Sequence, residues 1–96
     1  MPKGYWVAKA NILDDKKLLS YGKEAEEAIK KFGGKFLVRG GQHETKEGID
    51  FSRNVVVEFD SFDIALAAYS SPEYKKALKL LEGGADRMYA VVEGYE

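Results

Sequence analysis

Residues 54–81 constrain the fold of this chain more than any other stretch. They open with a β-branched and aromatic run at 55–59, turn at Asp60-Ser61, and continue as two helical pieces that break at Ser70-Ser71-Pro72. A strand followed almost directly by a helix is half of a small α/β unit. Because the stretch contains no nucleophile–base pair, metal-ligand set or phosphate loop, it indicates an architecture and leaves the reaction open.

The size and charge of the chain argue against several classes of protein. Its 96 residues predict a single domain, 1–96, whose thin core favours help from a partner chain. Fifteen basic and sixteen acidic residues give a net charge of −1, which favours neither nucleic acid nor an anionic membrane as a partner. Cysteine is absent, which excludes disulfides and thiolate chemistry. Since no apolar run approaches the ~20 residues that span a bilayer, we expect a soluble, cytoplasmic protein with no membrane contact.

The remaining elements follow from hydrophobic periodicity and capping residues. We expect strands at 5–12, 35–39, 55–59 and 87–93, and a polar, mobile loop at 42–53 that borders any pocket. A first helix is capped at Asp14-Asp15 and stopped at Gly33-Gly34. Its apolar positions recur at three- and four-residue steps: Leu18, Tyr21, Ala25, Ala28, Ile29 and Phe32. The order β-α-β-β-α-β predicts an α+β, ferredoxin-like fold with a four-stranded antiparallel sheet and helices on one face.

Strand alternation assigns side chains to the two faces of this sheet. We expect Trp6, Phe36, Val57 and Met88 to be buried, with the helices covering the face that also holds Val55. The other face is expected to display Tyr5, Val7, Leu37, Val56, Tyr89 and Val91 beside the charged Lys9, Arg39, Glu58 and Glu93. So many apolar side chains on one surface predict a symmetric homodimer joined through this open face.

Several short motifs in one order resemble the domain-of-unknown-function family 1330 over nearly the whole chain. They are Gly4-Tyr5-Trp6, the run Gly33-Gly34-Lys35-Phe36-Leu37-Val38-Arg39-Gly40-Gly41, Glu47-Gly48, the run Arg53-Asn54-Val55-Val56-Val57-Glu58-Phe59, Ser71-Pro72-Glu73-Tyr74, and Val92-Glu93-Gly94. The family is similar to the dimeric α/β barrel superfamily, in which two ferredoxin-like subunits pack sheet against sheet. Relatives in that superfamily include cofactor-free monooxygenases, haem-dependent chlorite dismutases and isomerases.

This resemblance implies the fold and a dimeric α/β barrel assembly, and it leaves the activity open. Members of the family commonly carry an arginine in the helix after the Ser-Pro-Glu-Tyr motif, where this chain has Leu81. If that arginine binds a ligand in the family, this chain lacks the role or Arg87 takes it over.

His43 is the weak candidate for a catalytic residue. It is the single histidine and the side chain whose ordinary pKa lies nearest neutrality, so it is the first choice for a general base. It stands in a polar loop without a partner at metal-ligand spacing, which favours a solvent-exposed histidine and no metal site. The glycine pairs fit neither the P-loop nor the dinucleotide pattern, so we expect no cofactor.

Arginines and tyrosines are the candidate ligand-binding residues. Arg39 or Arg53 can bind the carboxylate of a small acid, because the guanidinium fork matches it. Tyr21, Tyr69 and Tyr74, together with Trp6, can line an apolar pocket between sheet and helices. The simpler interpretation is that these arginines form cross-strand ion pairs and that the aromatic residues belong to the core.

Three classes of function remain. The first is a homodimer that binds a small molecule, acidic or aromatic, between sheet and helices without chemistry of its own. The second is a cofactor-free oxygenase or isomerase, as in the antibiotic-biosynthesis monooxygenases, in which the substrate supplies the reactivity and the protein a dry pocket. The third is a structural or stress-related interaction module. We favour the first, because the sequence contains no recognisable catalytic set.

Overall fold

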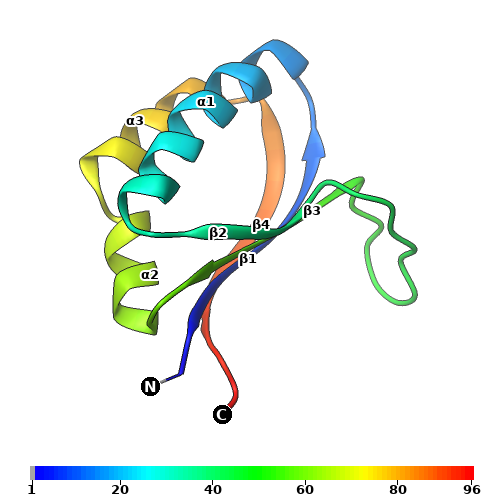
Figure 1. The fold of residues 1–96 in the computed structure, drawn as a ribbon. Coiled ribbons are helices and arrows are strands. Elements are labelled where there is room, and N and C mark those ends of the chain that lie inside the picture. The colour runs from blue at the N-terminus through cyan, green and yellow to red at the C-terminus, as the bar shows by residue number, and fades with distance from the viewer. Residues whose placement is uncertain (1) are drawn as a thin grey trace.

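The computed structural model describes residues 2–96 and has one four-stranded antiparallel sheet with the helices on one face (Figure 1). The elements are β1 (Gly4–Ile12), α1 (Asp15–Lys31), β2 (Lys35–Arg39), β3 (Arg53–Phe59), α2 (Phe62–Tyr69), α3 (Pro72–Leu81) and β4 (Ala85–Glu93). The strands lie in the order β2-β3-β1-β4. The predicted ferredoxin-like β-α-β-β-α-β fold is confirmed, with its second helical region divided into α2 and α3.

Local capping sets the ends of the helices. The carboxylate of Asp14 accepts hydrogen bonds from the first backbone N–H groups of α1, and the hydroxyls of Ser61 and Ser71 do the same for α2 and α3. Pro72 stands at the start of α3, where its missing N–H costs no helical hydrogen bond. The cap at Asp14 agrees with the prediction, and Ser61 and Ser71 lie at the predicted turn and helix break. The caps at Ser61 and Ser71 explain why the second helical region is divided into α2 and α3.

Trp6 occupies the centre of the core. Its side chain is fully buried, and its indole N–H donates to the carbonyl oxygen of Ala65 at 2.8 Å. Four other aromatic rings have centroids within 5.8 Å of the Trp6 ring: Phe59, Tyr69, Tyr74 and Tyr89. The methyl groups of Ala65 and Ala68 are also fully buried, because small side chains let α2 lie close to the sheet.

The faces of β4 are the reverse of those predicted. Met88, expected in the core, is 58% exposed, whereas Tyr89 packs against Trp6. Trp6 pairs with Val91 and Ala8 pairs with Tyr89, so these side chains share the helix-covered face. Apolar residues stand on both sides of this strand, so alternation could not choose between them, and a shift of one residue exchanges the two faces.

An irregularity in β2 corrects a second prediction. The register of β2 against β3 shifts between Phe36 and Val38, which places the partly buried Phe36 and the later Arg39 on the same side of the sheet. Arg39 therefore points toward α1 and away from the open face.

Glu93 of β4, also predicted on the open face, pairs with the buried Gly4 in the row that faces the helices.

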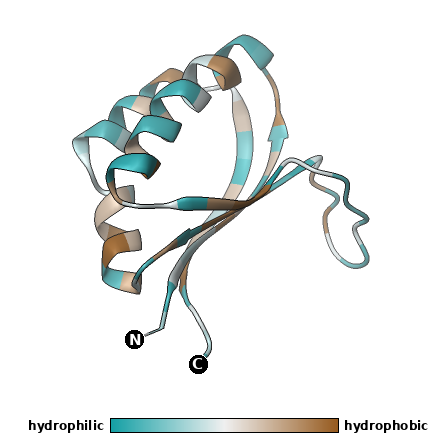
Figure 2. Ribbon diagram, viewed as in Figure 1, coloured by the Kyte–Doolittle hydropathy of each residue, from teal (hydrophilic) through white to brown (hydrophobic). Residues whose placement is uncertain are grey.

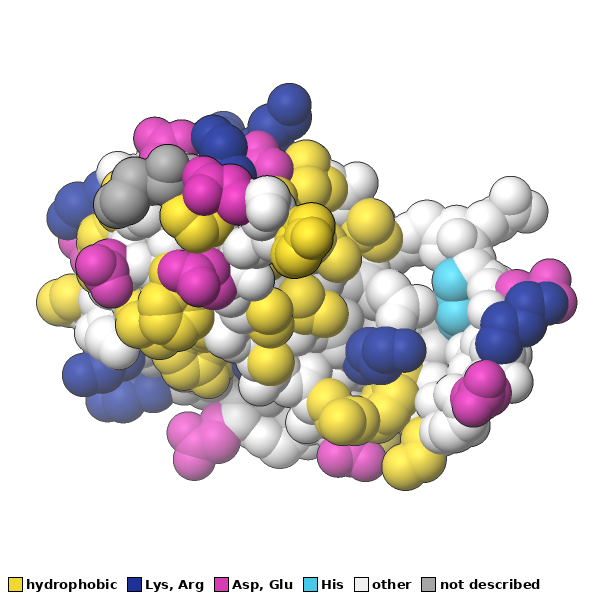
Figure 3. Space-filling model, turned by 90° about the horizontal axis from the view of Figure 1, so that it is seen from below, with side chains coloured by type: hydrophobic (Ala, Val, Ile, Leu, Met, Phe, Trp, Pro, Cys, Tyr) yellow, Lys and Arg dark blue, Asp and Glu magenta, His cyan; other side chains and the backbone are white. Residues whose placement is uncertain are grey.

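The sheet keeps an apolar surface on its open face. Figure 2 shows hydrophobic colouring along the middle of the strands, and Figure 3 shows hydrophobic side chains gathered on the side seen from below. We use the name open face for the side of the sheet that the helices do not cover. By strand register, its side chains include Tyr5, Val7, Lys9, Val38, Val56, Glu58, Met88, Ala90 and Val92. Across residues 2–96, the helices are too short or too polar for any of them to cross a membrane.

Candidate functional site

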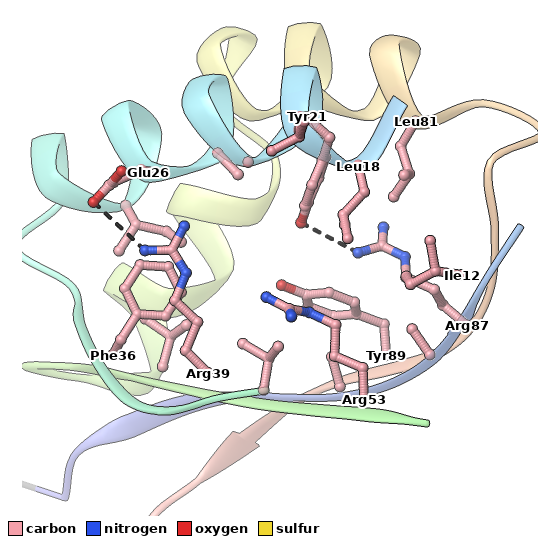
Figure 4. Close-up of a pocket in the computed structure, with 18 of the residues that line it drawn as sticks. Ile12, Leu18, Tyr21, Glu26, Phe36, Arg39, Arg53, Leu81, Arg87 and Tyr89 are labelled. Carbon is pink, nitrogen blue, oxygen red and sulfur yellow. Dashed lines mark hydrogen bonds and ion pairs between the residues drawn. The ribbon is translucent and has the colours of Figure 1, made fainter. Parts of the chain in front are cut away.

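A cavity of about 360 Å³ lies between α1 and the helix-covered face of the sheet (Figure 4). Its walls are mainly apolar, and its lining residues come from α1, the end of α3 and all four strands. They are Ala8, Ala10, Ile12, Leu18, Leu19, Tyr21, Gly22, Lys23, Ala25, Glu26, Ile29, Phe36, Arg39, Arg53, Val55, Val57, Leu81, Arg87 and Tyr89. Small-molecule sites have volumes of roughly 300–1,000 Å³, so this cavity suits a ligand at the small end of that range.

Arg39 stands at one end of the cavity, where β2 ends. Its guanidinium carbon lies 4.2 Å from the centroid of the Phe36 ring, which is a cation–π contact. Its Nη1 is 3.5 Å from a carboxylate oxygen of Glu26 on α1, and both side chains are 40% exposed. This pair ties β2 to α1 through a half-exposed contact, which is a weak ion pair.

Arg87 enters the cavity from β4. Its Nη1 donates a hydrogen bond of 3.2 Å to the hydroxyl oxygen of Tyr21, and its guanidinium lies about 5 Å from the rings of both Tyr21 and Tyr89. Burial opposes its charge, but the Tyr21 and Tyr74 hydroxyls outweigh burial and raise the pKa of Arg87 above its ordinary value. The hydrogen bond and the ring contacts therefore fix the position of the Arg87 guanidinium, which stays positively charged.

Tyrosine hydroxyls form the polar inner wall behind Arg87. The hydroxyl oxygens of Tyr21 and Tyr74 are 2.5 Å apart, and Tyr74 is fully buried. Burial is the main cause that raises the pKa of the Tyr74 phenol, followed by the charge of a neighbouring Tyr21. Burial likewise raises the pKa of Tyr89. These two hydroxyls stay protonated at neutral pH and act as hydrogen-bonding groups.

Arg53 begins β3 and rises from the sheet into the cavity (Figure 4). Its guanidinium lies over the backbone of Gly40, where a β-carbon would stand 2.4 Å from Nη1. Gly40 also has a φ of +69°, so glycine suits this position on both counts. Within residues 2–96, no carboxylate lies within ion-pair distance of the Arg53 guanidinium, and no protein group accepts a hydrogen bond from that guanidinium.

Charge is unevenly distributed between the cavity and the rest of the chain. Four basic side chains and one acidic side chain, Glu26, line the cavity, although the whole chain has a net charge of −1. Apolar walls lower the local dielectric constant and strengthen the field of these cations. The cavity therefore combines a local excess of positive charge with apolar walls.

The structure brings together three of the predicted ligand-binding residues: Tyr21, Arg39 and Arg53 all line the cavity. Tyr74 lies directly behind Tyr21, and Tyr69 packs on Trp6 in the core. Sequence reasoning had placed Tyr89 on the opposite face and had given Glu26 no role.

The family resemblance predicts a role for Arg87 only as the substitute for an arginine where this chain has Leu81. Both Leu81 and Arg87 line the cavity. The signal for Arg87 was present in the sequence, because an arginine inside an apolar strand needs a polar partner on whichever face it occupies.

The loop between β2 and β3 holds His43 away from this cavity and projects from the sheet (Figure 1). The Nε2 atom of His43 is 3.9 Å from a carboxylate oxygen of Asp50, and both residues line a shallow, open depression formed by the loop itself. Of the stretch 42–53, the residue that lines the α1 cavity is Arg53. Among residues 2–96, no three His, Cys, Asp or Glu side chains come together to hold a metal ion.

The chain belongs to the family of the domain of unknown function DUF1330, whose model matches residues 3–95. Among the curated proteins, none matches it significantly. Solved structures with the same fold include a protein of unknown function from Rhodopseudomonas palustris, with a TM-score of 0.78, 14% identity, and coverage of 99% of this chain and 84% of that one.

Two further structures show the same fold. A dimeric ferredoxin-like protein of unknown function from Thermobifida fusca has a TM-score of 0.54 and 16% identity, covering 96% of this chain and 91% of its own. SnoaB, a cofactor-independent oxygenase from Streptomyces nogalater, has a TM-score of 0.62 and 9% identity, covering 100% of this chain and 96% of its own. At these identities the likeness concerns the fold alone.

Proposed function

We propose that this protein is a homodimer that binds a small organic acid with an apolar or aromatic body in the cavity between α1 and the sheet. The observation that carries this proposal is the excess of basic side chains in a cavity with mainly apolar walls. Arg53 and Arg87 are partly buried, and withdrawing a cation from water costs free energy unless it meets a counter-charge. The chain supplies one carboxylate in the lining, Glu26. An acidic ligand would supply the missing charge.

The open face supports the homodimer. One row of side chains crosses all four strands there, from Val38 through Val56 and Val7 to Ala90, and all four are apolar. Met88 and Val92 extend this surface and are 58% and 44% exposed. A contiguous apolar surface of this kind marks an interaction site, and its central position on a sheet suits a two-fold sheet-to-sheet contact. The ferredoxin-like protein from Thermobifida fusca is dimeric, which supports a dimeric state.

Calorimetric titration of the protein with phenylacetate tests the binding proposal. We expect saturable binding, and NMR shift changes at backbone amides of α1 and of the strand residues that line the cavity. Amide shifts confined to the 42–52 loop, or no binding at millimolar phenylacetate, would contradict it.

A cofactor-free oxygenase is the second candidate. Its support is the fold that the chain shares with SnoaB, together with a cavity in which Arg87 polarises the Tyr21 hydroxyl. Oxygen consumption, measured with an oxygen electrode, distinguishes binding alone from turnover. If the protein is an oxygenase, 1-hydroxy-2-naphthoate, an electron-rich aromatic acid, should consume dioxygen faster with the protein than without it. Equal rates would leave the binding function as the better account.

A further inference from the structure

Resting on the proposed function, we propose that the acidic group of the ligand is a single carboxylate, bound above Ala10 between Arg53 and Arg87. The apolar body of the ligand then lies along the neighbouring row of the sheet, beneath α1. Three observations carry this placement: the different engagement of the three arginines, the register of β1 with its two neighbours, and the side chains in the next row.

The three arginines of the cavity are not equally available. Arg39 has a carboxylate partner in Glu26 and a ring beneath it. Arg87 already donates one hydrogen bond, to Tyr21. Arg53 is half-buried, and none of its guanidinium N–H groups has an acceptor among residues 2–96. A guanidinium has five N–H donors in a fork that matches a carboxylate, so Arg53 is the primary anchor and Arg87 the second.

Strand register brings Arg53 and Arg87 to the two sides of one small residue. Ala10 on β1 pairs with Arg53 on β3 and with Arg87 on β4, so all three side chains rise on the same face. Adjacent strands are about 4.8 Å apart, which puts the two arginine Cα atoms roughly 10 Å from each other. Ala10 lines the cavity, and its methyl group takes up less of the space between the two arginines than a longer side chain would. The Arg53 guanidinium lies over Gly40, on the β2 side of β3. To share a carboxylate above this methyl group with Arg87, the flexible Arg53 side chain turns toward β1.

The next row of the sheet accounts for the body of the ligand. Ala8 pairs with Val55 on one side and with Tyr89 on the other, and all three line the cavity. Again a small residue lies between two larger apolar ones, so a shallow trough continues from the charged row. A flat hydrocarbon or aromatic group fits this trough, with Tyr89 available for ring contacts. The ligand class is therefore a monocarboxylic acid with a compact apolar or aromatic body.

Two probes of nearly the same shape test the charge. Phenylacetate carries the carboxylate, and phenylacetamide replaces it with a neutral amide. Calorimetry at pH 7 should give the wild-type protein at least about tenfold tighter binding of phenylacetate, because charge-assisted hydrogen bonds to two arginines are lost with the amide. Equal affinities would overturn the carboxylate site while leaving small-molecule binding intact. If neither probe binds, the proposed function fails as well.

Matched variants test the position. Arg53→Gln should weaken phenylacetate binding about tenfold and leave phenylacetamide binding nearly unchanged, whereas Arg39→Gln should have a smaller effect on the acid. The reverse ranking would move the anion to Arg39 and overturn the placement.

Ala10→Asp and Ala10→Asn differ only in charge, and neither requires the loss of an arginine. The aspartate carboxylate should pair with Arg53 and Arg87. In the absence of ligand, the Ala10→Asp protein should therefore melt at a higher temperature than the Ala10→Asn protein. It should also lose the preference for phenylacetate over phenylacetamide. A lower melting temperature for the aspartate variant would contradict a cationic site above Ala10.

Discussion

The phenol oxygens of Tyr21 and Tyr74 lie 2.5 Å apart, and this hydrogen bond joins the wall of the cavity to the core of the protein. Tyr21 belongs to α1 and lines the cavity, while Tyr74 belongs to α3 and packs against Trp6. Because Arg87 donates to the same Tyr21 oxygen, α1, α3 and β4 meet at one oxygen atom. The wall of the cavity is thus held by the same contacts that stabilise the fold.

The buried phenols predict a loss of stability in alkali. The pKa of Tyr74 and that of Tyr89 are raised in the folded state, in both cases first by burial. Above the ordinary tyrosine pKa of about 10, the unfolded chain loses these protons and the folded chain keeps them. The free energy of unfolding should therefore be at its full value below pH 10 and fall as the pH rises further. Circular dichroism and absorbance at 295 nm, followed against pH, should show that a part of the phenolate formation coincides with unfolding.

Tyr74→Phe is the control for this alkaline transition. Removing the hydroxyl should cost about 1 kcal/mol at neutral pH, because the hydrogen bond to Tyr21 is lost. The same change should make the decline above pH 10 less steep, since one buried titrating group is gone. Parallel alkaline curves for the two proteins would show that Tyr74 does not contribute to the transition.

Gly4 should tolerate no side chain, because β1 and the start of α2 approach closely there. A β-carbon at Gly4 would lie 2.4 Å from the carbonyl oxygen of Ser61 and 2.6 Å from the Cα of Phe62, both backbone atoms. Gly4→Ala should lower the free energy of unfolding by roughly 1–3 kcal/mol, the usual range for overpacking. Gly41→Ala is the matched control, since no atom lies within 4 Å of its β-carbon position. Urea denaturation of both variants measures the difference, and equal midpoints would contradict the close approach.

The parts of the fold that follow from local chemistry were predictable from the sequence. Caps at Asp14, Ser61 and Ser71 depend on a side chain and its nearest backbone N–H groups, and all three lie where the sequence indicated. The face of β4 was not predictable in this way. Met88 and Tyr89 are both acceptable in a core, and only the packing around Trp6 decides which one enters it.

The candidate site was predictable in its residue types more than in its arrangement. Arg39 and Arg53 could be chosen because guanidinium groups near strands need partners. Their common cavity depends on the irregular register of β2, which no local pattern signals. The position of Arg87 beside Tyr21 depends on which face of β4 is turned toward the helices. Because the sequence does not determine that face, it could not predict where Tyr89 and Arg87 lie.

Glu26 is the acidic side chain of the cavity and should compete with the ligand for its cations. Its carboxylate lies 3.5 Å from Arg39. Glu26→Gln should free this arginine and tighten phenylacetate binding about two- to fivefold at low salt, with the gain reduced at high salt. Calorimetry at two salt concentrations measures both effects. Glu27→Gln, on the exposed side of the same helix, is the control and should change little. Weaker binding after Glu26→Gln would show that the carboxylate supports the site.

Val56 is the residue at which a charge should separate the proposed dimer. It pairs with Val7 on one side and Val38 on the other, so it lies in the middle of the apolar row across the open face. In a sheet-to-sheet dimer, Val56→Glu would bury two carboxylates near the two-fold axis, where like charges and lost hydration both oppose association. Val56→Thr keeps the shape of the side chain and should dimerise more weakly than the wild type but more strongly than the glutamate variant. Sedimentation velocity at low micromolar concentration should show a dimer for the wild-type protein and a folded monomer for Val56→Glu, with folding checked by circular dichroism. A wild-type monomer at that concentration, or a glutamate variant that remains dimeric, would exclude association through this face.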